Sequence, residues 1–153
     1  MKIPSRILMA TDFSDCSAEA LDYAVLLAKH FGADLYLFHA FEALPYKIPA
    51  SASTARPGAF EWLRTLKEEE EKRLGALVGE IYQKGVKAYP VFKEGVPFRE
   101  IPEAAREVEA DLIVLGTHGR TGLDRLMMGS VAERVVRGAP CPIFLVKPKA
   151  LME

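Results

Sequence analysis

The sequence predicts an α/β fold: one domain over residues 1–153, with helices on both faces of a doubly wound, five-stranded parallel sheet. Two observations predict it. Five short apolar segments alternate with four longer segments of helical periodicity, as in repeated β-α-β units. Several of the short segments are apolar almost throughout, which is typical of strands covered on both faces. Right-handed crossovers then favour the strand order 3-2-1-4-5.

The first part of the chain is expected to form a strand, a helix and a second strand. Residues 6–11 are short and apolar and predict the first strand. From Ser17 apolar residues recur with a helical period as far as Phe31, and Gly32 is the expected stop. Residues 33–40, ADLYLFHA, predict the second strand. Residues 43–59 contain three prolines and many small residues, so we expect a mobile loop there.

A long helix is expected next, over residues 60–84, with Gly85 as its stop. The residues expected to face inward are Leu63, Leu66, Leu74, Leu77 and Ile81. The run KEEEEKR at residues 67–73 could be a binding patch, but charges on a helix usually form a solvated face. We therefore interpret the run as solvated.

The second half repeats the alternation of strands and helices. Residues 86–92, VKAYPVF, predict a third strand interrupted by Pro90. The segment 95–97 leads into a helix whose apolar residues are Phe98, Ile101, Ala105 and Val108. The remaining elements are a fourth strand at 111–116, a fourth helix at 130–138 and a fifth strand at 142–147.

Composition excludes several classes of function. Twenty basic residues against twenty-one acidic residues leave a net charge of -1, which provides no electrostatic footprint for nucleic acid or a membrane surface. The first residues lack the apolar core of a signal peptide, and no stretch approaches the ~18 apolar residues of a membrane span. Cys16 and Cys141 have no metal-binding spacing. We expect a cytoplasmic protein.

The predicted strand order places a ligand site between the first and fourth strands. Doubly wound sheets bind ligands where the winding direction reverses, outside the carboxyl ends of the strands. The loops there are TDFSDCS, residues 11–17, and the glycine-rich GTHGRTGLDRLMMGS, residues 116–130. Glycines and a helix start together favour an anion such as phosphate. A capping box from Ser130 to Glu133 would satisfy the same backbone donors without a ligand, so both interpretations stay open.

The glycine spacing, G-x2-G-x9-G-[ST] over residues 116–130, resembles the ATP-binding branch of the universal stress protein family. The resemblance extends over the whole chain. It implies that Gly116, Gly119, Gly129 and Ser130 hold ribose and phosphates. It also implies that Asp12 lies beside the nucleoside and that the backbone of Ala40 meets adenine. The other ligand contacts expected from the resemblance are Ala10, Thr11, Thr117, His118, Arg120 and Val131.

The resemblance implies an ATP-binding stress-response protein: a nucleotide-dependent binding or signalling module for a downstream protein partner that the sequence does not identify. Mg²⁺ is expected to accompany the phosphates, with Asp12 as its nearest protein group. We assign no catalytic or metal-binding residue, expect at most slow ATP hydrolysis, and interpret His39 and His118 as hydrogen-bonded structural groups.

Several alternatives differ in class. The chain could be an interaction module of the same fold that binds no nucleotide, or a flavodoxin-like FMN-binding protein. An ATPase or a kinase-like transferase is a third alternative, although the sequence offers no obvious base for water. A receiver domain is disfavoured, because VFKEG stands where the phosphoacceptor aspartate should follow the third strand.

A homodimer is expected from the two edges of the predicted sheet. Exposed edge strands invite pairing with another chain. The third strand contains Pro90 and Lys87, both of which discourage pairing, whereas residues 142–147 are apolar between Pro142 and Lys147. The fifth strand is therefore the expected two-fold interface, as the family resemblance also implies.

Overall fold

The computed structural model describes residues 2–43, 58–119 and 128–152. Its five-stranded sheet is parallel throughout and has the order β3-β2-β1-β4-β5, which confirms the predicted fold class. The strands are β1 (Arg6–Ala10), β2 (Asp34–Phe41), β3 (Ala88–Glu94), β4 (Leu112–Gly116) and β5 (Ile143–Val146). The helices are α1 (Asp15–Phe31), α3 (Ala59–Gln83), α4 (Pro97–Glu107) and α5 (Ser130–Gly138), with a 3-10 turn η2 (Lys149–Leu151) near the end.

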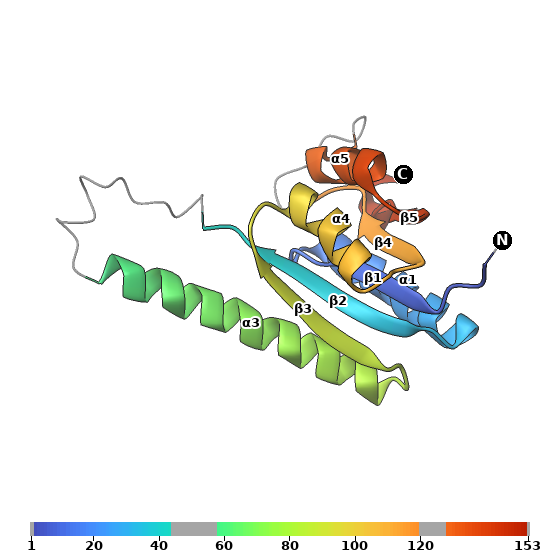
Figure 1. The fold of residues 1–153 in the computed structure, drawn as a ribbon, viewed down its shortest axis with the longest axis horizontal. Coiled ribbons are helices and arrows are strands. Elements are labelled where there is room, and N and C mark those ends of the chain that lie inside the picture. Colours follow the sequence, from blue (N-terminus) through green and yellow to red (C-terminus); the bar gives the residue numbers. More distant parts are fainter. Residues whose placement is uncertain (1, 44–57, 120–127, 153) are drawn as a thin grey trace.

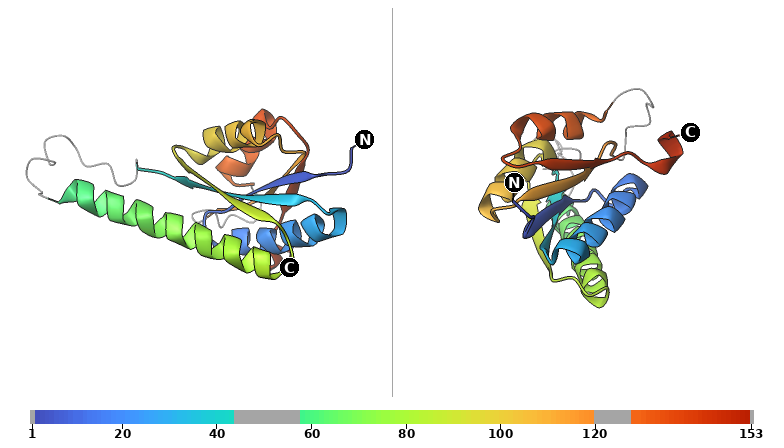
Figure 2. Two further views of the ribbon diagram at one scale, coloured as in Figure 1. Left: turned by 60° about the horizontal axis from the view of Figure 1, so that its bottom comes forward. Right: turned by 90° about the vertical axis from the view of Figure 1, so that its right-hand side faces the viewer.

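The helices cover both faces of the sheet, α1 and α3 on one and α4 and α5 on the other (Figures 1 and 2). Each face has its own apolar core. Ile7 and Met9 of β1 belong to the core under α1 and α3, whereas Leu8 and Ala10 belong to the core under α4 and α5. All four side chains are buried, which explains why the central strands are apolar almost throughout.

Helix α1 begins earlier than its apolar period suggested. Its first residue is Asp15, and the side chain of Ser14 caps it by accepting from the backbone N–H of Ser17. Gly32 ends the helix in the left-handed conformation, with φ of 66°, as predicted. Phe31 is more exposed than its place in the period implied. The polar segment before Ser17 therefore forms the start of α1 as well as the first of the two loops predicted to carry the ligand.

The charged run of α3 is only partly a solvated face. Glu68, Glu69 and Glu71 are exposed, as predicted. Lys67 and Glu70 are only partly exposed, so the prediction is wrong for these two. Lys67 pairs with Glu94 of β3 at 2.9 Å, and Glu70 lies 3.5 Å from His39 of β2. Arg73 is exposed, as predicted, although its guanidinium lies over the ring of Phe13 in the loop after β1. Helix packing turns one side of the run toward the sheet.

Two predictions concern segments that the structure does not describe in full. Most of the loop predicted at 43–59 lies outside the described residues, as do residues 120–127 of the glycine-rich loop. In the part of the chain that is described, no helix is both long and apolar enough to cross a membrane.

Asp111 joins the amino ends of β1 and β4, the two strands whose other ends carry the predicted ligand loops. Its carboxylate lies 2.7 Å from Nζ of Lys2 and accepts hydrogen bonds from Oγ of Ser5 and from the backbone N–H groups of Ser5 and Arg6. The ion pair with Lys2 and these hydrogen bonds hold the pKa of the Asp111 carboxyl well below its usual range, against the effect of burial. The ionised carboxylate therefore stabilises the folded state.

We expect Asp111→Asn to lower the free energy of unfolding by about 1–3 kcal/mol at neutral pH, because charged hydrogen bonds are lost. Because the pKa of Asp111 is lower in the folded than in the unfolded protein, its carboxylate stabilises the fold fully at pH values above the ordinary aspartate pKa of about 3.9. This stabilisation is lost as the pH falls below that value. The difference between variant and wild type should shrink in acid. Urea unfolding across this pH range measures it. Glu109→Gln, which removes an exposed partner of Arg6, should change stability by less than about 1 kcal/mol. A pH-independent difference for Asp111→Asn would contradict the assignment.

Candidate functional site

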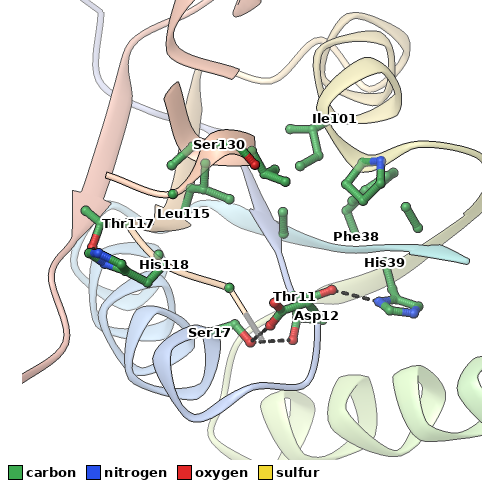
Figure 3. Close-up of a pocket in the computed structure, with 18 of the residues that line it drawn as sticks. Thr11, Asp12, Ser17, Phe38, His39, Ile101, Leu115, Thr117, His118 and Ser130 are labelled. Atoms are coloured by element: carbon green, nitrogen blue, oxygen red, sulfur yellow. Dashed lines mark hydrogen bonds between the residues drawn. The ribbon is translucent and has the colours of Figure 1, made fainter. Parts of the chain in front are cut away.

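A cavity of about 480 Å³ opens at the carboxyl ends of β1, β2 and β4, where the winding of the sheet reverses (Figure 3). This volume is within the ~300–1,000 Å³ of small-molecule sites. The two loops predicted to carry the ligand, after β1 and after β4, both contribute to its walls. The strand order therefore produces a cavity at the place where the sequence predicted a site.

Every residue predicted to contact the ligand lines this cavity, except Arg120, which lies outside the described residues. The lining residues that were predicted are Ala10, Thr11, Asp12, Ala40, Gly116, Thr117, His118, Gly119, Gly129, Ser130 and Val131. They come from the last residues of β1, β2 and β4, from the loops after β1 and β4, and from the first turn of α5. Folding brings them together around one space.

Asp12 is held in place by its own loop. Its Oδ1 accepts hydrogen bonds from the backbone N–H of Ser14, at 3.0 Å, and from Oγ of Ser17, at 2.9 Å. Thr11 adds a further bond, because its Oγ1 accepts from the backbone N–H of Phe13. This network orients the carboxylate so that Oδ2 lies against Gly119 of the opposite loop.

The glycines of the motif allow the loops to approach each other closely. A Cβ at Gly119 would lie 2.9 Å from Oδ2 of Asp12, and one at Gly116 would lie 2.8 Å from Sγ of Cys16. A Cβ at Gly129 would lie 2.9 Å from the carbonyl oxygen of Thr117. Contacts this short are incompatible with an unshifted side chain, so close packing accounts for the glycine spacing in addition to any contact with an anion.

The alternative of a capping box at Ser130, which the sequence left open, does not form. Gly129 is the N-cap of α5, no side-chain cap is found among the described residues, and Ser130 is the first helical residue. Gly129 takes this place because its backbone N–H donates to the carbonyl of Thr117 at 2.7 Å, which anchors the helix start to the end of β4. Glu133 pairs with Arg137 instead of reaching back. Within the described part of the chain, the first turn of α5 therefore presents its backbone donors without a capping side chain.

The opposite side of the cavity is apolar and acidic. Figure 3 shows Thr117, His118 and Ser130 to one side and Phe38 and His39 to the other. Phe38, Ala40 and Ile101 provide apolar lining, and Leu115, which Figure 3 shows near Ser130 and Thr117, adds to it. The carboxylates of Asp12, Glu42 and Glu70 also line it, and the described lining residues include no lysine or arginine.

Both histidines of the site are hydrogen-bonded, as predicted. Nδ1 of His39 lies 2.7 Å from the carbonyl oxygen of Thr11, and Nδ1 of His118 lies 2.8 Å from Oγ1 of Thr117. Both rings are buried. Each therefore fixes the backbone or side chain of a neighbouring site residue.

Sequence reasoning missed several residues of the cavity wall. Glu42 directly follows β2, and its position at the carboxyl end of a strand next to β1 was a usable signal. Glu70 and Ile101 lie on α3 and α4, and no motif marks them. Their place in the wall depends on how these helices pack on the sheet, which local sequence does not specify.

Comparison with known proteins agrees with this architecture. The family model of the universal stress protein family matches residues 4–147. Universal stress protein MJ0531 of Methanocaldococcus jannaschii is 41% identical over 144 residues, which cover 93% of this chain and 81% of that protein.

Solved structures show the same fold. That of MJ0577, also from Methanocaldococcus jannaschii, has a TM-score of 0.83 at 27% identity and covers 97% of this chain and 99% of its own. A universal stress protein from Archaeoglobus fulgidus, solved in complex with dAMP, has a TM-score of 0.64 at 24% identity, with coverage of 95% and 100%. Sequence and structure agree: the chain belongs to the universal stress protein family.

Proposed function

We propose that this member of the universal stress protein family binds ATP at the cavity between β1 and β4 and acts as a nucleotide-dependent binding or signalling module in the stress response. The observation that carries the proposal is the open start of α5, which faces a cavity with an apolar opposite side. One cavity thus offers surroundings for a phosphate and for a nucleobase.

The start of α5 suits the phosphates. The first backbone N–H groups of a helix have no intrahelical acceptor, and the helix dipole favours negative charge there. Ser130, Val131 and Ala132 of this first turn line the cavity. Because neither Ser130 nor Glu133 caps the helix, a phosphate oxygen can accept these hydrogen bonds without displacing either side chain.

The opposite side suits a nucleoside. Phe38, Ile101 and Leu115 supply apolar surface for a base, and the carboxylates of Asp12 and Glu42 can accept hydrogen bonds from ribose hydroxyls or an exocyclic amine. The dAMP complex of the Archaeoglobus fulgidus neighbour supports an adenine nucleotide as the ligand class.

The charges of the cavity suit a nucleotide that brings a cation with it. The described lining has three carboxylates, so a bare triphosphate would meet repulsion. No group of three metal-ligating side chains occurs among the described residues, and a Mg²⁺ ion would therefore be held chiefly by the phosphates. Asp12, whose Oδ2 faces the glycine loop, is the protein group proposed to lie nearest the ion.

We expect Gly119→Val to weaken ATP binding at least tenfold, because the new Cβ would displace the Asp12 carboxylate and fill the space beside the phosphates. A tenfold loss is about 1.4 kcal/mol. Calorimetric titration with ATP measures the affinity. Gly79→Val is the matched control, because a Cβ at that helical glycine meets nothing within 4 Å. His118→Ala should have a smaller effect than Gly119→Val. Wild-type affinity in Gly119→Val would refute the assignment of the loop.

The small molecule that copurifies with the protein separates the alternatives, and mass spectrometry identifies it. ATP or ADP supports the proposed function. FMN would instead support a flavodoxin-like protein. Failure of the purified chain to bind any nucleotide, in extraction and in titration alike, would support an interaction module of the same fold.

Mg²⁺ is expected to strengthen ATP binding, and EDTA is expected to reverse the effect, because the ion neutralises the phosphates beside the carboxylates. Hydrolysis should stay far below the ~10 s⁻¹ of a typical enzyme, since Oδ1 of Asp12 is already engaged by two donors. Titration with and without Mg²⁺, together with a phosphate-release assay, measures both quantities. Turnover near 10 s⁻¹ that is abolished in Asp12→Asn would show that the protein is an enzyme.

We also propose that two copies pair through β5. This strand is at the sheet edge opposite β3 and pairs only with β4 among the described strands. The carbonyl groups of Pro142 and Val146 accept from β4, so the backbone N–H and C=O of Leu145 are directed to the open side. Phe144 is 37% exposed and its ring lies 5.9 Å from that of Tyr23, which extends the apolar edge onto α1.

Leu145→Pro and Phe144→Lys should both weaken self-association, the first by removing an edge N–H and the second by placing charge in the interface. Analytical ultracentrifugation measures the association constant. Tyr89→Lys is the matched control, because Tyr89 is equally exposed on the opposite edge strand. A wild-type monomer at micromolar concentration would rule out this interface.

A further inference from the structure

The loop that carries Asp12 contains a strained residue. Phe13 has φ of 64°, in the left-handed region that bulky side chains rarely occupy. Such a conformation persists only where surrounding contacts hold it. Phe13 directly follows Asp12, so contacts that hold Phe13 also hold the backbone from which the Asp12 carboxylate reaches its hydrogen-bond donors.

The Phe13 ring lies between two side chains from other parts of the fold. Its centroid is 4.3 Å from that of His39 on β2, and the guanidinium carbon of Arg73 on α3 lies 4.6 Å from the same ring centroid. Stacking and cation–π attraction both stabilise the ring in this position. Helix α3 thus contacts the ligand loop directly, although it is distant in the sequence.

His39 makes a second connection to the same helix. Its Nδ1 must carry a hydrogen, because the carbonyl of Thr11 only accepts. Its Nε2 is buried, has no hydrogen bond among the described residues and lies 3.5 Å from Oε2 of Glu70. His39 therefore contacts α3 through Glu70 while its other ring nitrogen holds the backbone of Thr11.

We propose that Glu70 and Arg73 form a clamp that positions Asp12 for its ligand by holding His39 and Phe13. The two clamp residues are three positions apart and so lie on the same side of α3. They belong to the charged run at residues 67–73. The inference rests on the proposed function only in assigning Asp12 to the ligand; the clamp itself exists without one.

Hydrogen exchange in the ligand-free protein tests the clamp. The backbone N–H groups of Phe13 and Ser14 donate to Thr11 and Asp12, so their exchange reports the order of the loop. Arg73→Ala should accelerate exchange at these two amides while the amide of Leu8 in β1 stays protected. Arg64→Ala, at an exposed arginine of the same helix, should leave all three unchanged.

Binding measurements then test the link to the ligand. Arg73→Ala should weaken ATP binding by about two- to fivefold, the range expected for losing one cation–π contact. Phe13→Gly removes the ring and relieves the positive φ, so adding Arg73→Ala to that variant should cause no further loss. Glu70→Ala should weaken binding, whereas Glu70→Gln should restore it in part, because an amide can donate to Nε2.

The outcomes distinguish the clamp from the proposed function. Unchanged exchange at Phe13 and Ser14 in both Arg73→Ala and Glu70→Ala overturns the clamp. Additive losses for Phe13→Gly and Arg73→Ala overturn it as well, since they would show that Arg73 acts independently of the ring. If the wild-type protein binds no nucleotide, the proposed function fails, while faster exchange at the two amides still supports the clamp.

Discussion

The contact between Asp12 and Gly119 is where two loops from different halves of the chain meet, and the site depends on it. Parallel strands bring their carboxyl ends to one edge of a sheet, and the reversal of winding between β1 and β4 leaves a gap there that no helix fills. The loops approach this closely because Gly119 carries no Cβ where it meets the carboxylate of Asp12. The strand order therefore creates the cavity, and the glycines allow the loops that form its walls to approach each other.

The electrostatics of the cavity follow from the same arrangement. The first turn of α5 contributes a positive dipole end, and the ends of β1 and β2 contribute the carboxylates of Asp12 and Glu42. A ligand that matches both must have an anionic part and a part rich in hydrogen-bond donors. The proposed ligand, a nucleotide, combines these features, and the described lining includes no lysine or arginine.

Helix α3 shows how a polar segment can serve two purposes. Most of its charged side chains are exposed to solvent. Lys67 contacts β3, Glu70 contacts β2, and Arg73 contacts the loop after β1. These contacts join sheet, helix and ligand loop on the face opposite α4 and α5. The strained backbone at Phe13 therefore belongs to a connected set of contacts.

The fold could be predicted almost completely from the amino-acid sequence, because the alternation of apolar strands and amphipathic helices is local and right-handed crossovers leave few arrangements of parallel strands. The glycine spacing likewise located the two loops of the site. The start of α5 was beyond such reasoning: Ser130 and Glu133 have the spacing of a capping box, but Gly129 becomes the cap because its N–H bonds to the end of β4. Glu70, Arg73 and the stack of Phe13 on His39 were beyond it too. These contacts join residues far apart in the chain, and only packing in three dimensions brings them within reach.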